Sequence, residues 1–434
     1  MKKSIYTALL CLLSLGLAAQ ETIYPAPAHQ GVIALTGGTI HIGNGSIIER
    51  GTVLIRNSRI EAVGPNVSVP SGAKVIPVAG KQVYPGLIAA SSNLGLTEIA
   101  SVRATSDFGE LGAYNPSVKA IMAYNAESKV IPTLRSNGVL LAQVTPRGGV
   151  FSGTSSVVQL DAWNWQDAAY KMNNGIHLNF PALVNRPGPF GGGGLQGRGG
   201  SSQEDALKAA LNRVEEIRSF LREAKAYSKS GGPVNLKYEA VKGLFDKSQK
   251  LFVHCDLTKE ILMALDFKKE FDLDLVIEGG TDSWMVADIL REHQVPVILS
   301  EPHNLPSMAD DAVDQPYKTA YLLHKAGVPF TIAIDGFWQQ RNLPFQAGTL
   351  AAYGLSKEEA LSAITLQAAR ILGIDRQTGS LEAGKDANIV VSDGDILDMK
   401  SSKVTHAFIQ GRQINLDNKH NQLFEKYKYR YNLK

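Results

Sequence analysis

Residues 251–300 indicate the fold most clearly, and they read LFVHCDLTKEILMALDFKKEFDLDLVIEGGTDSWMVADILREHQVPVILS. Three apolar runs, at 251–256, 273–280 and 295–300, have the near-continuous hydrophobicity of strands that are buried on both faces. The two longer segments between them carry apolar residues at the spacing of helices. This alternation predicts a parallel sheet with helices packed against it.

The same alternation extends in both directions. Further apolar strands are predicted at 138–146 and 328–335, and a long amphipathic helix at 201–229. Residues 82–378 therefore suit a (β/α)8 barrel, a TIM-like α/β fold that needs about 250 residues. A doubly wound open sheet is the alternative, but no Gly-rich nucleotide-binding motif follows a predicted strand. The Gly-rich segment 186–202 is expected to be a loop or linker.

Both ends of the chain show a different pattern, with short alternating runs punctuated by turns. Residues 22–81 and 379–415 each contain too few strands to bury a sheet face. We therefore expect them to pair into one small β-sandwich domain. The tail, 416–434, alternates tyrosines with basic residues. This predicts an edge strand that packs its tyrosines down, with binding of an anionic polymer as the alternative.

The first residues have the pattern of a secretory signal peptide. Lys2 and Lys3 precede an apolar run from Ile5 to Leu17, and small residues follow this run. The arrangement predicts that residues 1–19 are cleaved and that the mature protein resides in the periplasm or outside the cell. Because the run is too short to span a bilayer comfortably, we expect no membrane insertion after cleavage.

The balance of charge argues against a nucleic-acid partner. The 434 residues include 44 Lys and Arg against 41 Asp and Glu, a formal net charge of +3. Proteins that bind nucleic acids through their phosphates normally carry a strongly basic patch. We expect a small-molecule substrate instead, and assembly into a homo- or hetero-oligomer stays open.

Polar residues follow the predicted strands at the end where barrel enzymes carry their active sites. His254 and Asp335 each end an apolar strand, which favours a role in catalysis or metal binding. For His254 alone, a core histidine with its hydrogen bonds satisfied is the alternative. We assign both residues as catalytic and as metal ligands. Five further residues at strand ends are predicted to bind substrate: Ser91, Asn93, Glu278, Glu301 and His303.

Several segments resemble the amidohydrolase superfamily, in particular its imidazolonepropionase-like and prolidase-like members. PGLI at 85–88 resembles the start of the first barrel strand, and LFVHCD at 251–256 resembles the fifth strand with its metal-binding histidine. FTIAIDGF at 330–337 resembles the eighth strand with its aspartate. The most specific likeness is 343–398, which resembles the last helices of the family and the return to the small β-domain. The resemblance implies a TIM-like barrel with a metal-dependent hydrolase activity.

The metal ligands depart from the family pattern. The first strand of the family carries two histidines where this chain has Ser91 and Asn93, and the sixth-strand histidine corresponds to Gly279. No counterpart of the fourth-strand lysine or glutamate is assigned. Serine and asparagine bind zinc poorly, and a catalytic zinc normally has three protein ligands. We therefore predict no binuclear centre, and either no metal or a single divalent ion, zinc, on His254 and Asp335 with one further side chain.

This degenerate metal-ligand pattern leaves more than one function open. The first is an exported hydrolase of C–N bonds other than peptide bonds, acting on a cyclic amide or a dipeptide-like substrate through an altered metal site. The second is a non-catalytic subunit that uses the barrel mouth for binding or assembly, and a structural relic is the third. A closed pocket of convergent polar groups favours the enzyme, whereas an exposed apolar patch favours the subunit.

Overall fold

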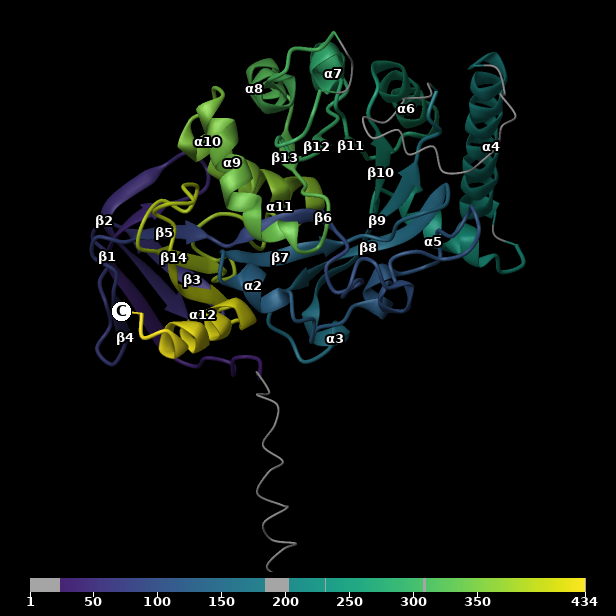
Figure 1. Cartoon of the computed structure of the whole chain (residues 1–434). Helices are drawn as coiled ribbons and strands as arrows, with labels where there is room; N and C mark the ends of the chain where they lie inside the picture. Colours follow the sequence, from purple (N-terminus) through teal and green to yellow (C-terminus); the bar gives the residue numbers. More distant parts are fainter. Residues whose placement is uncertain (1–23, 184–202, 231, 307–309, 434) are drawn as a thin grey trace, which may run out of the picture.

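The computed structural model describes residues 24–183, 203–230, 232–306 and 310–433 (Figure 1). The predicted signal peptide and the Gly-rich segment lie outside these residues. The described chain forms two sheets, one from the middle of the sequence and one from its two ends. In Figure 1 the second sheet lies beside the first, and helix α4 (Gln203–Ser230) stands at the opposite end of the molecule.

The first sheet has eight strands and forms the barrel. In spatial order they are β13 (Phe330–Ile332), β12 (Val297–Leu299), β11 (Leu275–Gly279), β10 (Lys250–Cys255), β9 (Ala169–Asn179), β8 (Phe151–Gln159), β7 (Val139–Val144) and β6 (Leu87–Ser92). β13 comes back beside β6, so the sheet is nearly closed. β9 to β13 are parallel to one another, and β6 is parallel to β7, which confirms the barrel expected from the apolar runs.

One strand departs from the regular (β/α)8 pattern, because β8 runs antiparallel to both β7 and β9. A parallel neighbour needs a crossover of about a dozen residues, usually a helix. Only residues 145–150 separate β7 from β8. Within them, Gly148 and Gly149 have positive φ angles of 92° and 65°, which let the chain reverse. The expectation of an all-parallel barrel fails at this strand.

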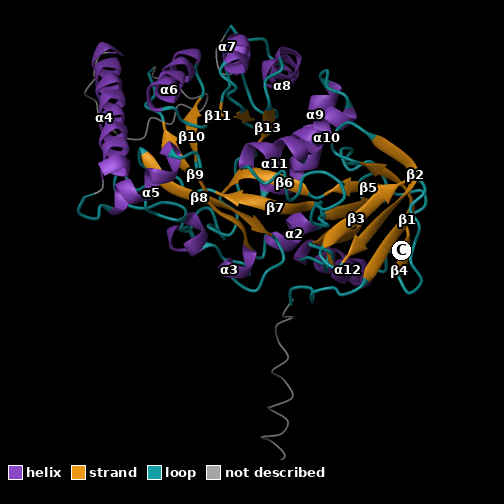
Figure 2. Ribbon diagram, turned by 180° about the vertical axis from the view of Figure 1, so that it is seen from behind, coloured by secondary structure: helices purple, strands orange, loops and turns teal. Residues whose placement is uncertain are grey.

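Helices cover the outside of the barrel, most visibly α4 and α6 to α8 in Figure 2. The α-helices after α4 are α5 (Leu236–Phe245), α6 (Thr258–Phe271), α7 (Ala287–Glu292), α8 (Gln315–Ala326), α9 (Leu343–Ala352), α10 (Lys357–Ala363) and α11 (Leu366–Leu372). Before it lie α2 (Ile131–Arg135) and α3 (Trp165–Ala168), and the 3-10 helices are η1 (Arg103–Thr105), η2 (Ala120–Ala123), η3 (Ser283–Val286) and η4 (Gln339–Asn342). The predicted long amphipathic helix is α4, which buries Val214, Ile217, Leu221 and Ala224 at helical spacing.

The second sheet joins the two ends of the chain. Its strands run in the order β16 (Arg412–Gln413), β15 (Val404–Ile409), β14 (Ile389–Ser392), β5 (Gln82–Pro85), β1 (Val32–His41), β2 (Ile47–Arg56) and β3 (Arg59–Gly64), and β4 (Lys74–Pro77) pairs with β1. The join is the antiparallel pair of β5 and β14, where Tyr84 lies opposite Val390. The predicted β-structure from both chain ends is confirmed, as one continuous sheet around a core that includes Ile33, Ile55 and Phe408.

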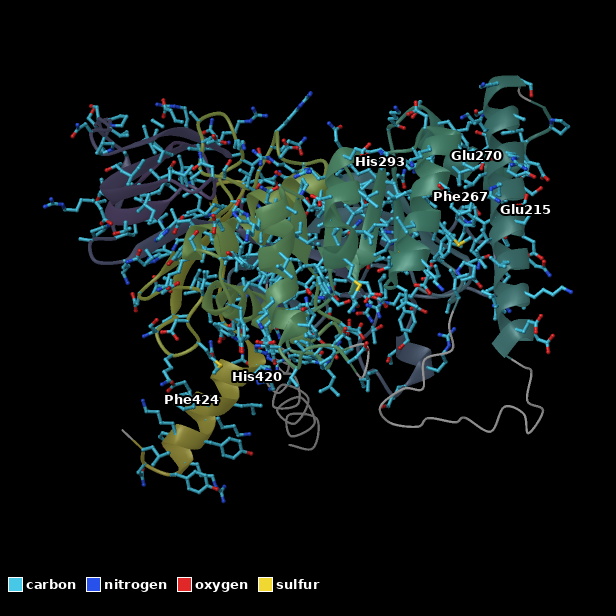
Figure 3. The ribbon with its side chains drawn as sticks, turned by 90° about the horizontal axis from the view of Figure 1, so that it is seen from above. Glu215, Phe267, Glu270, His293, His420 and Phe424 are labelled. Carbon is cyan, nitrogen blue, oxygen red and sulfur yellow. The ribbon has the colours of Figure 1, made fainter. Side chains whose placement is uncertain are left out.

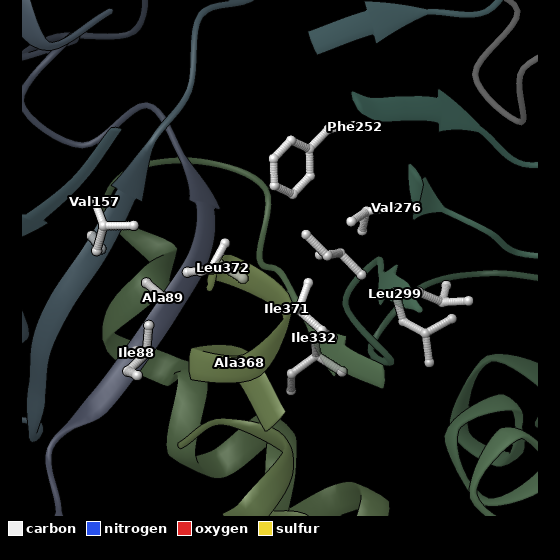
Figure 4. Close-up of a cluster of buried hydrophobic side chains, with 14 of the residues drawn as sticks. Ile88, Ala89, Val157, Phe252, Val276, Leu299, Ile332, Ala368, Ile371 and Leu372 are labelled. Atoms are coloured by element: carbon white, nitrogen blue, oxygen red, sulfur yellow. The ribbon is translucent and has the colours of Figure 1, made fainter. Parts of the chain in front are cut away.

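The barrel strands and the last helices share one apolar core (Figure 4). Phe252 of β10, Val276 of β11 and Leu299 of β12 are buried there, and α11 contributes Ile371 and Leu372. Complete burial of such a side chain stabilises the fold by about 1.5–3 kcal/mol. This core fixes the positions of the strands whose carboxyl ends carry the polar residues.

The tail forms helix α12 (Lys419–Arg430), so the predicted edge strand is wrong. Asn418 starts the helix, because its side chain accepts hydrogen bonds from the backbone N–H groups of His420 and Asn421. The tyrosines of the tail are exposed instead of packed against a sheet. Among the described residues, no helix combines the length and the hydrophobicity needed to cross a bilayer.

Candidate active site

A cavity of about 760 Å³ opens at the carboxyl ends of the barrel strands. This is the end of a barrel where catalytic groups gather, and the volume suits a small molecule. The polar residues that line it are Ser91, Arg147, Asn179, His254, Asp256, Glu260, Glu278, Ser300, Glu301, Asn304 and Asp335. The wall therefore combines one arginine and one histidine with several carboxylates.

Three side chains of types that can bind a metal meet at adjacent strand ends: His177 of β9, His254 of β10 and Glu278 of β11. Nδ1 of His177 is 2.9 Å from Nε2 of His254 and 3.6 Å from Oε2 of Glu278. Nδ1 of His254 is 3.4 Å from Oε1 of Glu278, because the parallel register places these two residues side by side. One donor atom from each residue lies within 4.8 Å of the others, a spacing that can hold one metal ion.

The three donors are incompletely paired, and they lie in a site where His177 is buried and the side chains of His254 and Glu278 are partly buried. His177 is fully buried and stacks on Phe252, with ring centroids 4.8 Å apart. Burial, followed by the neighbouring charges of His254 and Arg147, holds the pKa of His177 well below its ordinary value. Its imidazole is therefore neutral, the form that binds metals. Nε2 of His177 and Oε2 of Glu278 are buried without a hydrogen-bond partner.

The donor chemistry fits a single divalent metal ion. An unpaired carboxylate oxygen is costly to bury, and a cation between the carboxylate and the two imidazoles would compensate that cost. Two histidines and one glutamate form a ligand set that catalytic zinc uses, with a fourth position open. The sequence-predicted pair of ligands is split, because His254 belongs to this cluster whereas Asp335 does not.

Ser91 holds the carboxylate of the cluster. Its hydroxyl donates a hydrogen bond to Oε1 of Glu278. Ser91 has a positive φ of 52°, a backbone conformation that costs a non-glycine residue about 1–3 kcal/mol. Its N–H donates to Oε1 of Gln143 at 3.2 Å, and Nε2 of Gln143 donates to Ser155 at 3.0 Å. This buried network fixes the hydroxyl against Glu278.

The sixth strand requires glycine at position 279. Gly279 has a φ of 97°, and a Cβ atom there would lie 2.7 Å from Oδ1 of Asp256. Asp256 accepts a hydrogen bond of 2.7 Å from Oγ1 of Thr281. The histidine of the family pattern would therefore be strained at this position and would have to displace the Asp256 carboxylate, and the preceding residue, Glu278, supplies the donor of the sixth strand.

Asp335 lines the same cavity but is engaged with Arg147. Nη1 of Arg147 donates to Oδ1 of Asp335 at 2.7 Å, and the side chain of Asp335 is 74% exposed. Glu301, at the end of the neighbouring strand, also lines the cavity. Burial, and to a smaller extent the charge of Asp335, raise the pKa of Glu301. This carboxyl group thus keeps its proton to a higher pH than an exposed glutamate does.

Two of the residues that the sequence predicted for the site do not line the cavity. Asn93 is buried, and its Nδ2 donates to Oγ1 of Thr97 at 3.4 Å. Nε2 of His303 lies 2.8 Å from Oγ1 of Thr349. The other five predicted residues share the cavity wall: Ser91, His254, Glu278, Glu301 and Asp335. Their roles in catalysis and substrate binding stay predictions.

His177 was not among the residues predicted from the sequence. This residue lies in GIHLNF, residues 175–180, at the end of β9. The segment places a histidine among apolar residues near a strand end, which is the signal that identified His254. The preceding part of β9 contains Lys171, Asn173 and Asn174, which interrupt the apolar run that would otherwise mark a strand.

A barrel with side chains of metal-binding types at its strand ends has the architecture that metal-dependent TIM-barrel enzymes use. Residues 274–414 match the model of the Amidohydrolase family. The chain is also similar to the crystal structure of an amidohydrolase from Thermotoga maritima MSB8, with 25% identity and a TM-score of 0.72. That match covers 88% of this chain and 99% of the other. Together these similarities support assignment of the chain to the amidohydrolase superfamily.

Two relatives by sequence agree with this assignment. Amidohydrolase tasK of Hapsidospora irregularis is 19% identical, over 82% of this chain and 38% of the relative. Imidazolonepropionase of Thermoplasma volcanium is 40% identical over 87 residues, which are 19% of this chain and 22% of the relative. The chain therefore matches much less than two thirds of the length of either relative.

Proposed function

We propose that this protein is an exported hydrolase of C–N bonds other than peptide bonds, with one divalent metal at an altered site. Similarity to the amidohydrolase superfamily supports hydrolysis. The single altered metal site is supported by one observation, the cluster of His177, His254 and Glu278 beside a polar cavity. The size of the cavity suits a cyclic amide or a dipeptide-like substrate.

The side chains of the site have different roles in the proposed reaction. A divalent ion on the three donors would polarise the scissile carbonyl and lower the pKa of water. Ser91 holds Oε1 of Glu278, which leaves Oε2 for binding. Glu301, with its raised pKa, donates a proton to the leaving nitrogen. Asp335 faces the cavity and accepts a proton from the attacking water.

Metal analysis tests the ligand set. The purified mature protein should bind one zinc ion per chain, measured by mass spectrometry and by competition with a chromophoric chelator. His254→Ala should lose the metal. Asp335→Ala should keep the metal but lose hydrolysis, whereas it would lose both if Asp335 were a ligand. His303→Ala lies outside the cavity and should keep both. Two ions per chain would contradict the single site.

A substrate panel tests the activity. Five- and six-membered cyclic amides, N-acyl amino acids and dipeptides that end in proline cover the chemistry proposed. Hydrolysis should require the metal and should fall at least about a hundredfold in Asp335→Ala, because general acid–base groups contribute 10²–10⁴-fold. Full activity in metal-free protein would contradict the proposal.

One observation favours the non-catalytic subunit as a second candidate. The ion pair with Arg147 engages Oδ1 of Asp335, so only Oδ2 is left to accept a proton in this arrangement. A metal-loaded protein that binds members of the panel in calorimetry but hydrolyses none would establish this alternative. Arg147→Gln should then weaken the binding of ligands that carry a carboxylate, because their partner is removed.

Export is a separate part of the proposal and rests on the first residues of the sequence. We expect a mature chain that begins at Ala19 or Gln20 and is found in the periplasm or the medium. Cell fractionation with N-terminal sequencing measures both. A protein that still begins at Met1 in the cytoplasm would overturn the export, without affecting the metal site.

A further inference from the structure

Helix α12 presents an aromatic stripe to solvent. Phe424, Tyr427 and Tyr431 are spaced by three and four residues, so they share one face of the helix. Their side chains are 63%, 50% and 63% exposed, and α12 has no buried residue. The helix is anchored at its start, where His420 lies against Trp338 with ring centroids 5.5 Å apart. Figure 3 shows the rest of α12, including Phe424, standing out from the body.

Basic residues border this stripe. Residues 419–433 carry four basic side chains and one acidic one, which are Lys419, Lys426, Lys428, Arg430 and Glu425. Their net charge, 4 − 1 = +3, equals that of the whole chain. Lys426 and Lys428 flank Tyr427 by one residue each, so they lie on the two sides of the stripe. The guanidinium of Arg430 lies over the ring of Tyr431, 5.8 Å from its centroid.

We propose that α12 binds the surface of an anionic lipid membrane. Aromatic rings are favoured at the headgroup level of a bilayer, and neighbouring lysines and arginines attract anionic lipids. A soluble anionic polymer would need the charges but not an exposed aromatic stripe at helical spacing. The helix lies in the plane of the interface and does not cross the membrane, so the anchored barrel is held next to the lipid.

Vesicle cosedimentation of the mature chain tests the charge. Binding is expected to vesicles of equimolar phosphatidylglycerol and phosphatidylcholine, not to phosphatidylcholine alone, and it should weaken as salt is added. A variant with Lys426→Gln, Lys428→Gln and Arg430→Gln should bind roughly a hundredfold more weakly, because each surface cation contributes about fivefold.

A matched control separates local from global charge. Lys208→Gln, Lys229→Gln and Lys269→Gln remove the same charge from exposed positions on α4 and α6. These helices lie at the other end of the molecule from α12 (Figure 1). The control should change vesicle affinity by less than about twofold, since charges beyond a Debye length are screened.

A second set of variants tests the aromatic stripe. Phe424→Ser, Tyr427→Ser and Tyr431→Ser together should weaken vesicle binding at least about tenfold, because they remove the apolar contact with the acyl boundary. Tyr429→Ser is the control, since Tyr429 is 88% exposed but lies off the stripe. Because none of these side chains is buried, thermal unfolding should be unchanged and should exclude misfolding as the cause.

Three results would overturn the membrane proposal. They are no binding to anionic vesicles, equal binding to neutral vesicles, and an aromatic variant that binds like the unmodified chain. If heparin bound as tightly and depended only on the basic residues, α12 would instead be a site for a soluble anionic polymer. None of these measurements depends on hydrolysis or on the metal.

Discussion

The two sides of the barrel mouth differ in chemistry although they are built from similar strands. On one side, β9, β10 and β11 bring His177, His254 and Glu278 within reach of one ion. On the other side, β6 and β13 meet at the seam of the nearly closed sheet. Ser91 of β6 orients Glu278, and Asp335 after β13 pairs with Arg147. The strands of the seam therefore supply residues that contact Glu278 or line the cavity, and the middle strands supply the three donors.

This difference shows how a barrel can change its ligand positions without losing a candidate metal site. All parallel strands present their carboxyl ends to the same mouth, so a donor at any of these ends reaches the same space. In this chain the first strand supplies a hydroxyl where the family has histidines, and the fourth strand supplies His177. The capacity for metal therefore depends on adjacent strand ends more than on one motif.

Replacing His177 by phenylalanine should cause the largest loss of metal binding. His177→Phe keeps an aromatic ring against Phe252 but removes a donor, so the fold should persist. The affinity for zinc should fall by more than about a hundredfold, beyond the 10–100-fold that loss of a supporting contact costs. Chelator competition measures it. Unchanged affinity would mean that the seam holds the metal after all.

Placing the family histidine back on the sixth strand should damage the fold. Gly279→His puts a side chain at a φ of 97° and against Asp256, and should lower the free energy of unfolding by about 2–4 kcal/mol. Gly80→His is the control, because Gly80 has a φ of 77° and a Cβ atom there would meet no other atom within 4 Å. Urea unfolding should show a smaller loss for the control. If Gly279→His were stable and bound a second metal ion, the prediction would be wrong, because the sixth strand could then carry the histidine of the family pattern.

The fold could be predicted where hydrophobic runs coincide with strands. Residues 251–300 are continuously apolar at each strand, so β10, β11 and β12 were expected. β8 was not, because its sequence FSGTSSVVQ is rich in serine although all nine residues are buried. Its hydroxyls find partners in the folded protein, as Ser155 does with Gln143 and Asn174. A sequence shows the polar groups but not their partners.

The candidate site could be predicted only in part, for a similar reason. His254, Glu278 and Asp335 follow recognisable apolar strands, and all three line the cavity. His177 lies near the end of β9, where polar residues interrupt the earlier part of the strand, so no continuous apolar run marked it. Asp335 lies outside the donor cluster and pairs with Arg147, which lies far away in the sequence. Only the three-dimensional structure shows this pairing.

Removing the hydroxyl of Ser91 should cause a moderate loss of metal affinity, and it tests whether the seam strand β6 orients the ligand Glu278. Ser91→Ala leaves Oε1 of Glu278 without its donor, and zinc affinity should fall about tenfold, as is usual for contacts that orient a ligand. Asn93→Ala is the matched control, because Asn93 lies two residues further along and does not line the cavity. Equal losses in both variants would reduce Ser91 to a structural role.

The smallest expected effect is electrostatic and lies at Asp335. Burial is the larger cause of the raised pKa of Glu301, and the charge of Asp335 is the smaller one. Asp335→Asn removes the second cause and should lower the pKa of Glu301 towards its ordinary value, which NMR titration of the Glu301 carboxyl carbon measures.

The same change should alter the pH dependence of stability. A raised carboxyl pKa means that the folded state loses stability as pH rises from 4.5 through the folded pKa, so the variant should lose less stability over that range. Loss of the exposed pair with Arg147 should change stability by no more than about 1 kcal/mol, and His303→Asn should leave the titration unchanged. If the pKa of Glu301 stayed the same in Asp335→Asn, the two carboxylates would not be electrostatically coupled. They could then not be regarded as an acid–base pair.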